Sequence, residues 1–582
     1  MKLRNLFILL VIAISTQSLF SQNDDKYTWW NPSNSEFNVI EGQAWPDKVE
    51  SRYDRLPASA KESVRGAVWD LSHNSAGLLI RFISNSPEIV VRYKVLGNVA
   101  MPHMPATGVS GVDLYSKTTV GEWQWCKGNY SFGETVTYKF RNLPVKDDNH
   151  SKGREYRLYL PLYNSVDSLE IGVIRDSVFE PLPLRKERPI VVYGTSIAQG
   201  GCASRPGMAW TAILERYMDR PLINLGFSGN GRLEKEIINL ISSIDAKVYI
   251  LDCLPNLIIG KKYPADDVYN RIRRSVEFLK SKRPEIPILL VDHASVHPDL
   301  NEVSHRAFAD LKASGIKGLF LLTHKELGLY YDSFVDGTHP TDYGMVAYAN
   351  AYEKKLREIL NEPVGDISTQ IPVTQNRDAN TYNWNNRHRE LLIMNEAKAP
   401  EVLFIGNSIT HYWGGEPVAE LRNGQQSWEK YFGKMNVRNF GFGWDRVENV
   451  LWRVYHDELD GYDAGYIVLM IGTNNISIHD SDEKIVDGIR FLIDAIKVRQ
   501  PKTKIVLLGI YPGKGREERV AELNLKLEQM AELQMVVYSN PGKLLFDAKG
   551  NIEESLFIDG LHPNNDGYDL LGAEIAKCLN QK

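Results

Sequence analysis

The pattern of apolar and polar residues changes near residue 185 of this chain. Before that point, short segments alternate between apolar and polar positions and are separated by Asn, Ser, Gly and Pro. The clearest of these segments are 77–83, 88–94 and 155–160. A period of two residues with frequent turns is typical of antiparallel strands that bury one face. Residues 22–185 are therefore predicted to form an antiparallel β-sandwich of jelly-roll type.

From Pro189 onwards, continuous apolar runs alternate with amphipathic stretches. The runs at 190–193, 247–251 and 288–291 predict strands, and the stretch at 268–282 predicts a helix. Continuous apolar strands separated by helices indicate a parallel sheet that is covered by helices on both faces. We therefore predict a first α/β domain over residues 186–362.

The same pattern restarts after a polar stretch. Residues 363–396 are predicted to be a linker, because their first half shows little periodicity. Apolar runs at 402–405, 466–470 and 505–508 then predict a second α/β domain over residues 397–582. The predicted fold class is multidomain, with one antiparallel β-sandwich followed by two α/β domains.

The length of the chain indicates several hydrophobic cores, and its net charge argues against strongly anionic partners. The chain has 582 residues, of which 43% are hydrophobic, and single cores seldom grow beyond ~250–300 residues. The formal net charge is -5 and the sequence pI is about 6.3. A nucleic-acid or anionic-membrane partner would normally need a basic patch, so we expect neither.

The N-terminus has the pattern of an export signal. Lys2 and Arg4 precede an apolar stretch at 6–14, and small and polar residues follow up to Ser21. The apolar stretch is much shorter than the ~20 residues that a membrane-spanning helix needs. We predict cleavage of residues 1–21, no membrane insertion afterwards, and a periplasmic or secreted protein.

Four cysteines are too few for a disulfide scaffold. They stand at positions 126, 202, 253 and 578. Cys202 and Cys253 could pair in an oxidising compartment, but the sequence alone does not fix this connectivity.

Two copies of one catalytic pattern stand out. Twice a strand-like run ends in Gly-x-Ser, and twice Asp-Gly-x-His-Pro follows about 150 residues later. A serine hydroxyl is a weak nucleophile until an imidazole takes its proton, and a carboxylate fixes the tautomer of that imidazole. The predicted triads are Ser196, Asp336 and His339 in the first half, and Ser408, Asp559 and His562 in the second.

Further blocks between these residues also recur in order. Asn224-Leu-Gly-Phe-Ser-Gly229 corresponds to Asn439-Phe-Gly-Phe-Gly-Trp444, and an asparagine follows each block, at positions 256 and 474. Together with the triads, these blocks resemble the SGNH branch of the GDSL hydrolases. The resemblance covers about two thirds of the chain and implies flavodoxin-like α/β domains.

The resemblance also implies an oxyanion hole in each half. Its donors would be the N–H of the serine, the N–H of the block-two residue and the side-chain amide of the later asparagine. These last two are Gly229 and Asn256 in the first half, and Trp444 and Asn474 in the second. Such preorganised donors stabilise the developing oxyanion, so the reaction requires no metal and no cofactor.

Trp444 departs from the family pattern, which has glycine at this position. The backbone N–H survives the change, but the indole could close or reshape the acyl pocket. A second copy that binds acetylated glycan without turning it over, or a structural remnant, therefore stays open as an alternative.

The β-sandwich carries a motif of its own. Gly111-Val-Asp113-Leu-Tyr115 resembles the Gly-x-Asp-Leu-Tyr motif of a sandwich that precedes a bacterial SGNH subfamily. The second half resembles platelet-activating-factor acetylhydrolase-like and carbohydrate-acetylesterase members. The resemblance implies an esterase that removes O-acetyl groups from polysaccharides or oligosaccharides, with acetylated plant or algal glycans as substrates. A lipase, lysophospholipase or thioesterase is the alternative.

Several other residues invite chemical interpretations. His411, three residues after Ser408, is a competing base, but it lacks a paired carboxylate and is predicted to pack locally or contact substrate. His293 and His297 have the i,i+4 spacing of metal ligands but are predicted to be exposed loop residues. Most of six sandwich tryptophans are predicted to be core residues: Trp29, Trp30, Trp45, Trp69, Trp123 and Trp125.

Overall fold

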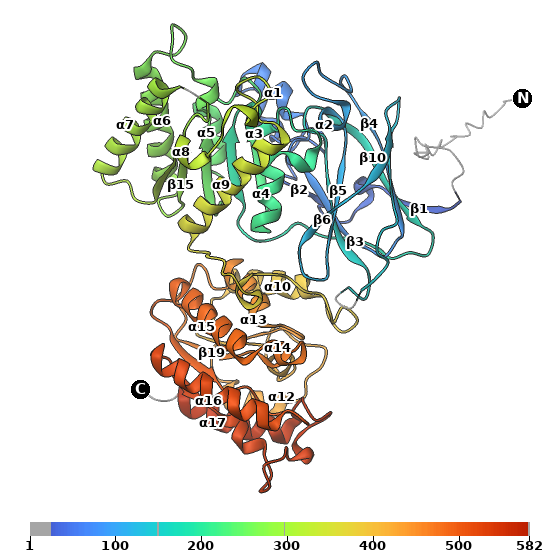
Figure 1. The fold of residues 1–582 in the computed structure, drawn as a ribbon, viewed down its shortest axis with the longest axis vertical. Coiled ribbons are helices and arrows are strands. Elements are labelled where there is room, and N and C mark those ends of the chain that lie inside the picture. Colours follow the sequence, from blue (N-terminus) through green and yellow to red (C-terminus); the bar gives the residue numbers. More distant parts are fainter. Residues whose placement is uncertain (1–24, 148–149, 296, 580–582) are drawn as a thin grey trace, which may run out of the picture.

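The computed structural model describes residues 25–147, 150–295 and 297–579. It shows antiparallel sheets followed by two parallel-sheet α/β domains, which confirms the predicted fold class (Figure 1). The predicted signal peptide, residues 1–21, lies outside the described residues. Among the described helices, none is both long and apolar enough to cross a membrane.

The sandwich consists of two antiparallel sheets with an apolar core between them. In spatial order, the first sheet contains β1 (Tyr27–Trp30), β10 (Val166–Ile174), β4 (Glu88–Val95), β8 (Val136–Arg141) and β7 (Gly128–Ser131). The second contains β11 (Phe179–Pro181), β3 (Leu79–Ser84), β9 (Arg154–Tyr159), β5 (Asp113–Lys117) and β6 (Trp123–Cys126), with β2 (Ile40–Glu41) beside β3. Two short helices, α1 (Gly66–Ser72) and α2 (Ala106–Val109), lie between strands along the chain.

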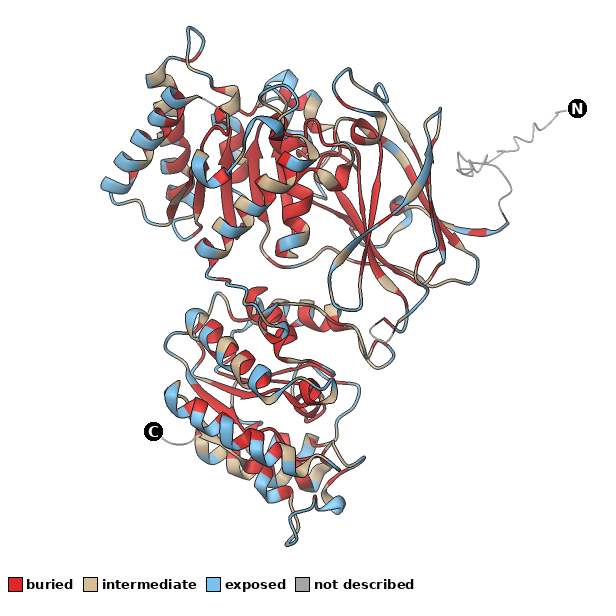
Figure 2. Ribbon diagram, viewed as in Figure 1, coloured by how far each residue is buried: buried red, intermediate tan, exposed pale blue. Residues whose placement is uncertain are grey.

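The first α/β domain is a five-stranded parallel sheet. Its spatial order is β13 (Leu222–Gly226), β12 (Ile190–Gly194), β14 (Val248–Asp252), β15 (Ile288–Val291) and β16 (Leu319–Leu322). Its helices are α3 (Ser196–Gln199), α4 (Trp210–Met218), α5 (Lys235–Ile241), α6 (Ala265–Lys282), α7 (Pro298–Ala313), α8 (His324–Leu327) and α9 (Asp342–Leu360). One core joins the sheet to α5, α6 and α7, and another joins it to α4 and α9. Helices therefore cover both faces, which explains why every residue of β12 to β15 is buried, whereas the edge strand β16 is partly exposed (Figure 2).

The second α/β domain repeats this architecture. Its strands are, in spatial order, β18 (Val437–Gly441), β17 (Val402–Gly406), β19 (Tyr466–Met470), β20 (Lys504–Leu508) and β21 (Val537–Ser539). Its helices are α10 (Trp384–Ala397), α11 (Ser408–His411), α12 (Gln425–Phe432), α13 (Val447–Tyr455), α14 (Thr473–Ser477), α15 (Asp482–Arg499), α16 (Glu517–Leu533) and α17 (Asn565–Leu579). Both sheets have the strand order 2-1-3-4-5, which places a crevice at the carboxyl ends of the first and third strands.

The segment predicted as a linker, 363–396, is largely part of the second domain. Its second half is helix α10, whose Trp384 and Leu391 are buried in the core of that domain. Its first half is fastened there as well, because the Thr369 hydroxyl donates to the Lys484 carbonyl at 2.8 Å. Trp384 and Leu391 are seven positions apart, which is about two helical turns, so they lie on the same face of α10.

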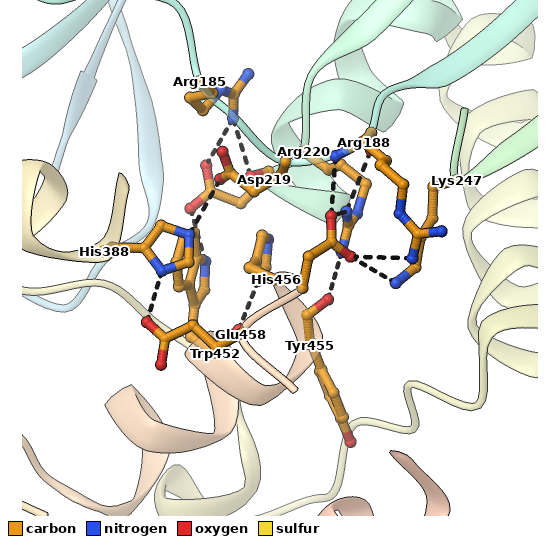
Figure 3. A network of polar contacts seen from close by, with 12 residues as sticks. Arg185, Arg188, Asp219, Arg220, Lys247, His388, Trp452, Tyr455, His456 and Glu458 are labelled. Atoms are coloured by element: carbon orange, nitrogen blue, oxygen red, sulfur yellow. Dashed lines mark hydrogen bonds and ion pairs between the residues drawn. The ribbon is translucent and has the colours of Figure 1, made fainter. Parts of the chain in front are cut away.

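Buried charges join the two halves of the chain. Asp219, at the end of α4, accepts hydrogen bonds from Lys117 of the sandwich and from the Trp452 indole of α13. Asp457, just after α13, accepts from Arg220 and Lys247 of the first α/β domain at 2.9 and 2.6 Å (Figure 3). Burial would raise the pKa of both carboxyls, but the surrounding cations hold the pKa of each well below its usual value.

The prediction that most sandwich tryptophans are core residues is confirmed only in part, since Trp30, Trp45 and Trp123 pack against a core without being enclosed by it. Only Trp69 is buried, and Trp125 is exposed. The other four are partly exposed, since large rings at sheet edges and loop ends cover the core without being enclosed by it.

All four cysteines are free, so the Cys202–Cys253 bridge that the sequence left open is not formed. Cys253 lies in the core with Val191 and Tyr193, whereas Cys202 lies in the core with Ile190 and Val192. Alternate residues of one strand point to opposite faces, so the two thiols lie on opposite sides of the sheet.

One buried carboxyl of the first domain, Asp252, has a neutral side chain as its hydrogen-bond partner. Asp252, the last residue of β14, accepts a hydrogen bond from the Tyr352 hydroxyl at 3.0 Å. Burial raises the pKa of this carboxyl to about 7, and the tyrosine offsets only part of the effect. Ionisation of Asp252 therefore opposes folding.

We predict that Asp252→Asn stabilises the protein more at pH 8 than at pH 5. Because the pKa of Asp252 is raised in the folded state, this group lowers the free energy of unfolding as pH rises from about 4 to 7, by up to about 4 kcal/mol. Thermal unfolding at both pH values measures the difference. Asp245→Asn, at an exposed aspartate, is the control, and an equal gain at both pH values would contradict the prediction.

Candidate functional site

The structure brings Ser196, His339 and Asp336 together at the carboxyl edge of the first parallel sheet. Ser196 begins α3, separated by one residue from the end of β12, and its Oγ lies 2.8 Å from Nε2 of His339. Nδ1 of His339 lies 2.7 Å from Oδ2 of Asp336. Burial opposes ionisation of Asp336, but hydrogen bonds from His339 and Thr338 outweigh it and lower the pKa of this carboxyl to about 2. The carboxylate is thus placed to hold the Nδ1 proton of the imidazole.

The second half has the same arrangement at the end of β17. Ser408 Oγ lies 2.9 Å from Nε2 of His562, and Nδ1 of His562 lies 2.7 Å from Oδ2 of Asp559. The pKa of Asp559 is lowered for the same reasons, with burial opposing and hydrogen bonds from His562 and Leu561 prevailing. Residues 154 positions apart therefore meet as closely as in the first half.

Of the predicted oxyanion-hole residues, Gly229 and Trp444 lie on loops after the second strand of each sheet, and Asn256 and Asn474 lie in short helices after the third. Asn256 Oδ1 accepts from the Gly231 N–H at 3.1 Å, which orients its amide beside the Gly229 loop. In the second half, Asn474 Nδ2 donates one hydrogen to the Asp445 carbonyl at 2.9 Å. An amide nitrogen carries two hydrogens, so Asn474 keeps one for another acceptor.

Gly229 and Trp444 share an unusual backbone conformation. Their φ angles are 68° and 64°, both in the left-handed region that a residue with a side chain adopts at a cost of about 1–2 kcal/mol. The loop has therefore kept its shape although the glycine is absent from the second copy. The Trp444 indole is 47% exposed, so it lies at the surface of the site instead of filling the core.

Comparison with known proteins agrees with this duplicated geometry. Two family models, each described as GDSL-like lipase/acylhydrolase, match the chain, one over residues 187–357 and the other over residues 404–570. The model described as the N-terminus of SGNH-hydrolase-type esterases, GxDLY, matches residues 27–179.

A solved structure named as that of a GDSL-like lipase from Bacteroides ovatus is 32% identical, with a TM-score of 0.52. The similarity covers 58% of this chain and 98% of that one. The chain belongs to the GDSL-like lipase and acylhydrolase family. Ester hydrolysis is the activity that this membership supports.

Curated relatives of this GDSL-family chain include a mammalian enzyme subunit. The human platelet-activating factor acetylhydrolase IB subunit alpha2 is 29% identical over 204 residues, which are 34% of this chain and 82% of the relative. The bovine alpha1 subunit is 27% identical over 188 residues, which are 32% of this chain and 74% of the relative.

Two buried asparagines hold the serine turns of this GDSL protein. Asn224 Nδ2 donates to the Ala198 carbonyl at 2.7 Å, and Asn439 Nδ2 donates to the Thr410 carbonyl at 2.7 Å. Each side-chain oxygen accepts from the glycine two residues later, at 2.8 Å. The sequence blocks contain both asparagines, but only the structure shows that they tie the second strand to the helix that begins at the serine.

Sequence reasoning missed a pair of arginines with equivalent contacts. Arg55 donates to the carbonyls of Asn224 and Gly226, and Arg387 donates to those of Asn439 and Gly441. Burial lowers the pKa of Arg55 to about 9 and that of Arg387 to about 10. Arg55 lies much further before the first strand of its α/β domain than Arg387 lies before the first strand of the second. The two arginines therefore share no sequence spacing that could have identified them.

The Gly-x-Asp-Leu-Tyr motif positions a loop near the first triad. Asp113 Oδ2 accepts from Arg205 at 2.6 Å and from the Gly207 N–H at 2.9 Å. Its Oδ1 accepts from the Trp125 indole at 2.7 Å. The buried carboxylate thus fastens the sandwich to the chain that follows helix α3, which begins at Ser196.

The other candidate histidines have structural partners. His411 is buried, and its Nδ1 accepts from the Gly443 N–H at 3.2 Å, which fits the predicted local packing role. The prediction that His293 is exposed was wrong, because it is buried and its Nδ1 accepts from the Ser295 N–H. Within the described ranges, no group of three or more His, Cys, Asp or Glu side chains is placed to hold a metal ion.

Replacement of Arg387 by methionine should destabilise the second domain by about 3 kcal/mol or more. Three buried carbonyls lose their donor, including that of Pro417, and each unsatisfied group costs about 1–3 kcal/mol. Urea unfolding followed by tryptophan fluorescence measures the change. Arg389→Met, two residues along α10 and only partly buried, is the matched control.

Asp113→Asn should lower the hydrolytic rate at the first triad about 10- to 100-fold, because it disturbs a loop beside the nucleophile. Ester hydrolysis by Asp113→Asn in a Ser408→Ala background measures this effect. The exposed Asp70→Asn serves as the control. An equal rate in both variants would show that the motif has no effect on this site.

Proposed function

We propose that this protein is an exported serine esterase that removes O-acetyl groups from carbohydrate through two Ser-His-Asp triads. The observation that carries the proposal is the presence of two serine–histidine–aspartate chains of contacts, with hydrogen-bond distances of 2.7–2.9 Å at every link. Export rests on the N-terminal sequence pattern.

In the acylation step, His339 Nε2 takes the proton of Ser196 as Oγ attacks the acetyl carbonyl carbon. The oxyanion is stabilised by the N–H groups of Ser196 and Gly229 and by the Asn256 amide. The bond to the alcohol oxygen then breaks, and that oxygen receives the proton from His339. Asp336 holds the Nδ1 proton and stabilises the imidazolium.

In the deacylation step, water gives a proton to His339 Nε2 and attacks the acetyl-enzyme. Collapse of the second tetrahedral intermediate releases acetate and returns the proton to Ser196 Oγ. At the second site, Ser408 is the nucleophile, His562 the base and Asp559 the carboxylate that orients it. The oxyanion donors there are the N–H groups of Ser408 and Trp444 and the Asn474 amide.

Family membership and one relative support the choice of acyl group. The human relative is named an acetylhydrolase and is 29% identical over most of its length. Carbohydrate as the alcohol is supported by the predicted export and by the absence of a lipid-docking feature in the sequence, because membrane-surface helices need a basic amphipathic face. Two esterases on one chain would also raise the local concentration of each site at one polymer.

Acetate release by single and double serine variants tests the proposal. Ser196→Ala and Ser408→Ala should each remove part of the activity on acetylated xylan, glucomannan and pectin. The double variant should lose at least about 10³-fold, because no nucleophile remains. Acetyl and dodecanoyl test esters compared in the same assay measure acyl preference.

Each outcome has a definite meaning. Full activity in the double variant would exclude both triads, and a preference for dodecanoyl esters would favour a lipase or thioesterase. Unchanged activity in Ser408→Ala alone would make the second copy non-catalytic. Ser228→Ala, beside the predicted oxyanion loop but outside both triads, controls for the loss of a serine hydroxyl.

A further inference from the structure

A large cleft between the two halves of the chain adjoins the predicted oxyanion residues of the second site. Its volume is about 1060 Å³, and its lining includes both predicted oxyanion residues of that site, Trp444 and Asn474. Pockets that enclose drug-sized ligands have volumes of roughly 300–1,000 Å³. The cleft is thus far larger than an acetyl group requires, and the remaining space is available to the alcohol part of an ester.

The first half of the chain supplies one wall of this cleft. The loop that joins β5 to β6 lines it through residues 119–122, together with Trp123 of β6 and with Arg216 and Tyr217 of α4. Hydrogen bonds from the Glu122 N–H to Thr118 Oγ1 at 3.1 Å and from the Thr118 N–H to the Glu122 carbonyl at 2.8 Å close the loop. The tip of the sandwich hairpin is therefore an ordered surface of the cleft.

This hairpin tip packs on the segment that precedes α10. A Cβ added to Gly121 would lie 2.9 Å from Cβ of Val373, so the two backbones approach closely. Lys117 Nζ also donates to Thr374 Oγ1 at 2.6 Å. The contact fixes the tip against residues 371–374, which lie at the same junction as the charges in Figure 3.

The same segment is fastened to the loop that carries Trp444. Asn449 Nδ2 donates to the Val373 carbonyl at 2.9 Å, and Gln375 Nε2 donates to the Gly443 carbonyl at 2.9 Å. The hairpin tip, the segment that starts at residue 371 and the loop that carries Trp444 thus form one continuous wall of the cleft. A change at the hairpin tip is in a position to affect what binds next to Ser408.

The side chains of the cleft suit a ring-shaped, hydroxyl-bearing ligand. Trp444 and Tyr217 are 47% and 40% exposed and offer aromatic faces, while Arg446, Glu448 and Glu122 offer hydrogen-bonding groups. Arg446 and Glu448 form an ion pair at 2.8 Å, so they present a fixed polar surface in the lining, and Glu122 is exposed. A carbohydrate can stack on the rings and satisfy the polar groups together.

We propose that this cleft binds the glycan part of the acetyl ester cleaved at Ser408, so that the β-sandwich of the first half is part of the substrate site of the second. The inference rests on the proposed function. It assigns Val120 and Trp444 as specificity-determining residues, one from each half of the chain.

One hairpin would then serve both sites. At its base, Asp113 and Trp125 fasten the loop that follows Ser196, and at its tip Val120 faces the cleft of the second site. The hairpin explains why the sandwich and the two catalytic domains stay on one chain, since the second site would lose a wall without the first half.

The test uses the full chain in a Ser196→Ala background, where only the second triad acts. The probes are acetylated oligosaccharides prepared from xylan, glucomannan and pectin, and 4-nitrophenyl acetate as an ester with a small alcohol. We expect Val120→Arg and Trp444→Gly each to lower the ratio of oligosaccharide to small-ester kcat/KM at least about tenfold. Trp444→Gly keeps the backbone N–H and places glycine at the left-handed φ, so the loop retains its fold.

Val145→Arg is the matched control, because Val145 is an exposed sandwich valine that is absent from the cleft lining. Its ratio should equal that of the parent. An unchanged ratio in Val120→Arg, or hydrolysis of 4-nitrophenyl acetate without hydrolysis of any oligosaccharide, would overturn the cleft proposal.

Failure of the proposed function gives a different result. In that case the Ser196→Ala protein would cleave neither class of ester, and a fluorophosphonate would not label Ser408. If the fluorophosphonate does label Ser408, comparison of a small and a glycan-linked fluorophosphonate supplies a second readout. Val120→Arg should slow labelling by the glycan-linked probe about tenfold relative to the small one, and equal slowing of both would refute the cleft.

Discussion

Buried ion pairs at the junction of the two halves determine how the rest of the molecule is placed. Asp219 of the first half and Asp457 of the second can remain charged at this junction because cations of the first half surround both. Removal of one partner from a buried pair typically costs about 3–5 kcal/mol, because the remaining charge is left uncompensated. Separation of the halves would break the pairs of Asp457, so the junction, with the cleft that Asp219 lines, keeps a defined shape.

A second constraint acts within each catalytic domain, at the edge strand beside the serine turn. The carbonyls at the ends of β13 and β18 are buried and need donors. Arg55 reaches the first from the sandwich side, and Arg387 reaches the second from α10. Two unrelated segments therefore meet one requirement, which shows that the geometry of the turn is maintained by packing as well as by its own motif.

Trp444 shows how a duplicated site can diverge without a change in its backbone. The residue accepts a left-handed conformation that glycine adopts freely in the first copy, and such strain persists where surrounding contacts impose it. Gln375 and Asn474 hold the loop on either side through its carbonyls. The second copy thus combines the same backbone donor with an aromatic surface that the first copy lacks.

The sequence alone determined the fold class, because the periods of strands and helices and their order along the chain can be read locally. It also paired the triad residues, because they stand in two motifs that the fold brings into contact. It placed α10 in a linker, made Trp125 and its neighbours core residues and left Arg55 and Arg387 unnoticed. Only the tertiary structure decided those points and the cleft beside Trp444. Each depends on which distant segment covers a residue or supplies its hydrogen-bond partner, and neither periodicity nor spacing along the chain contains that information.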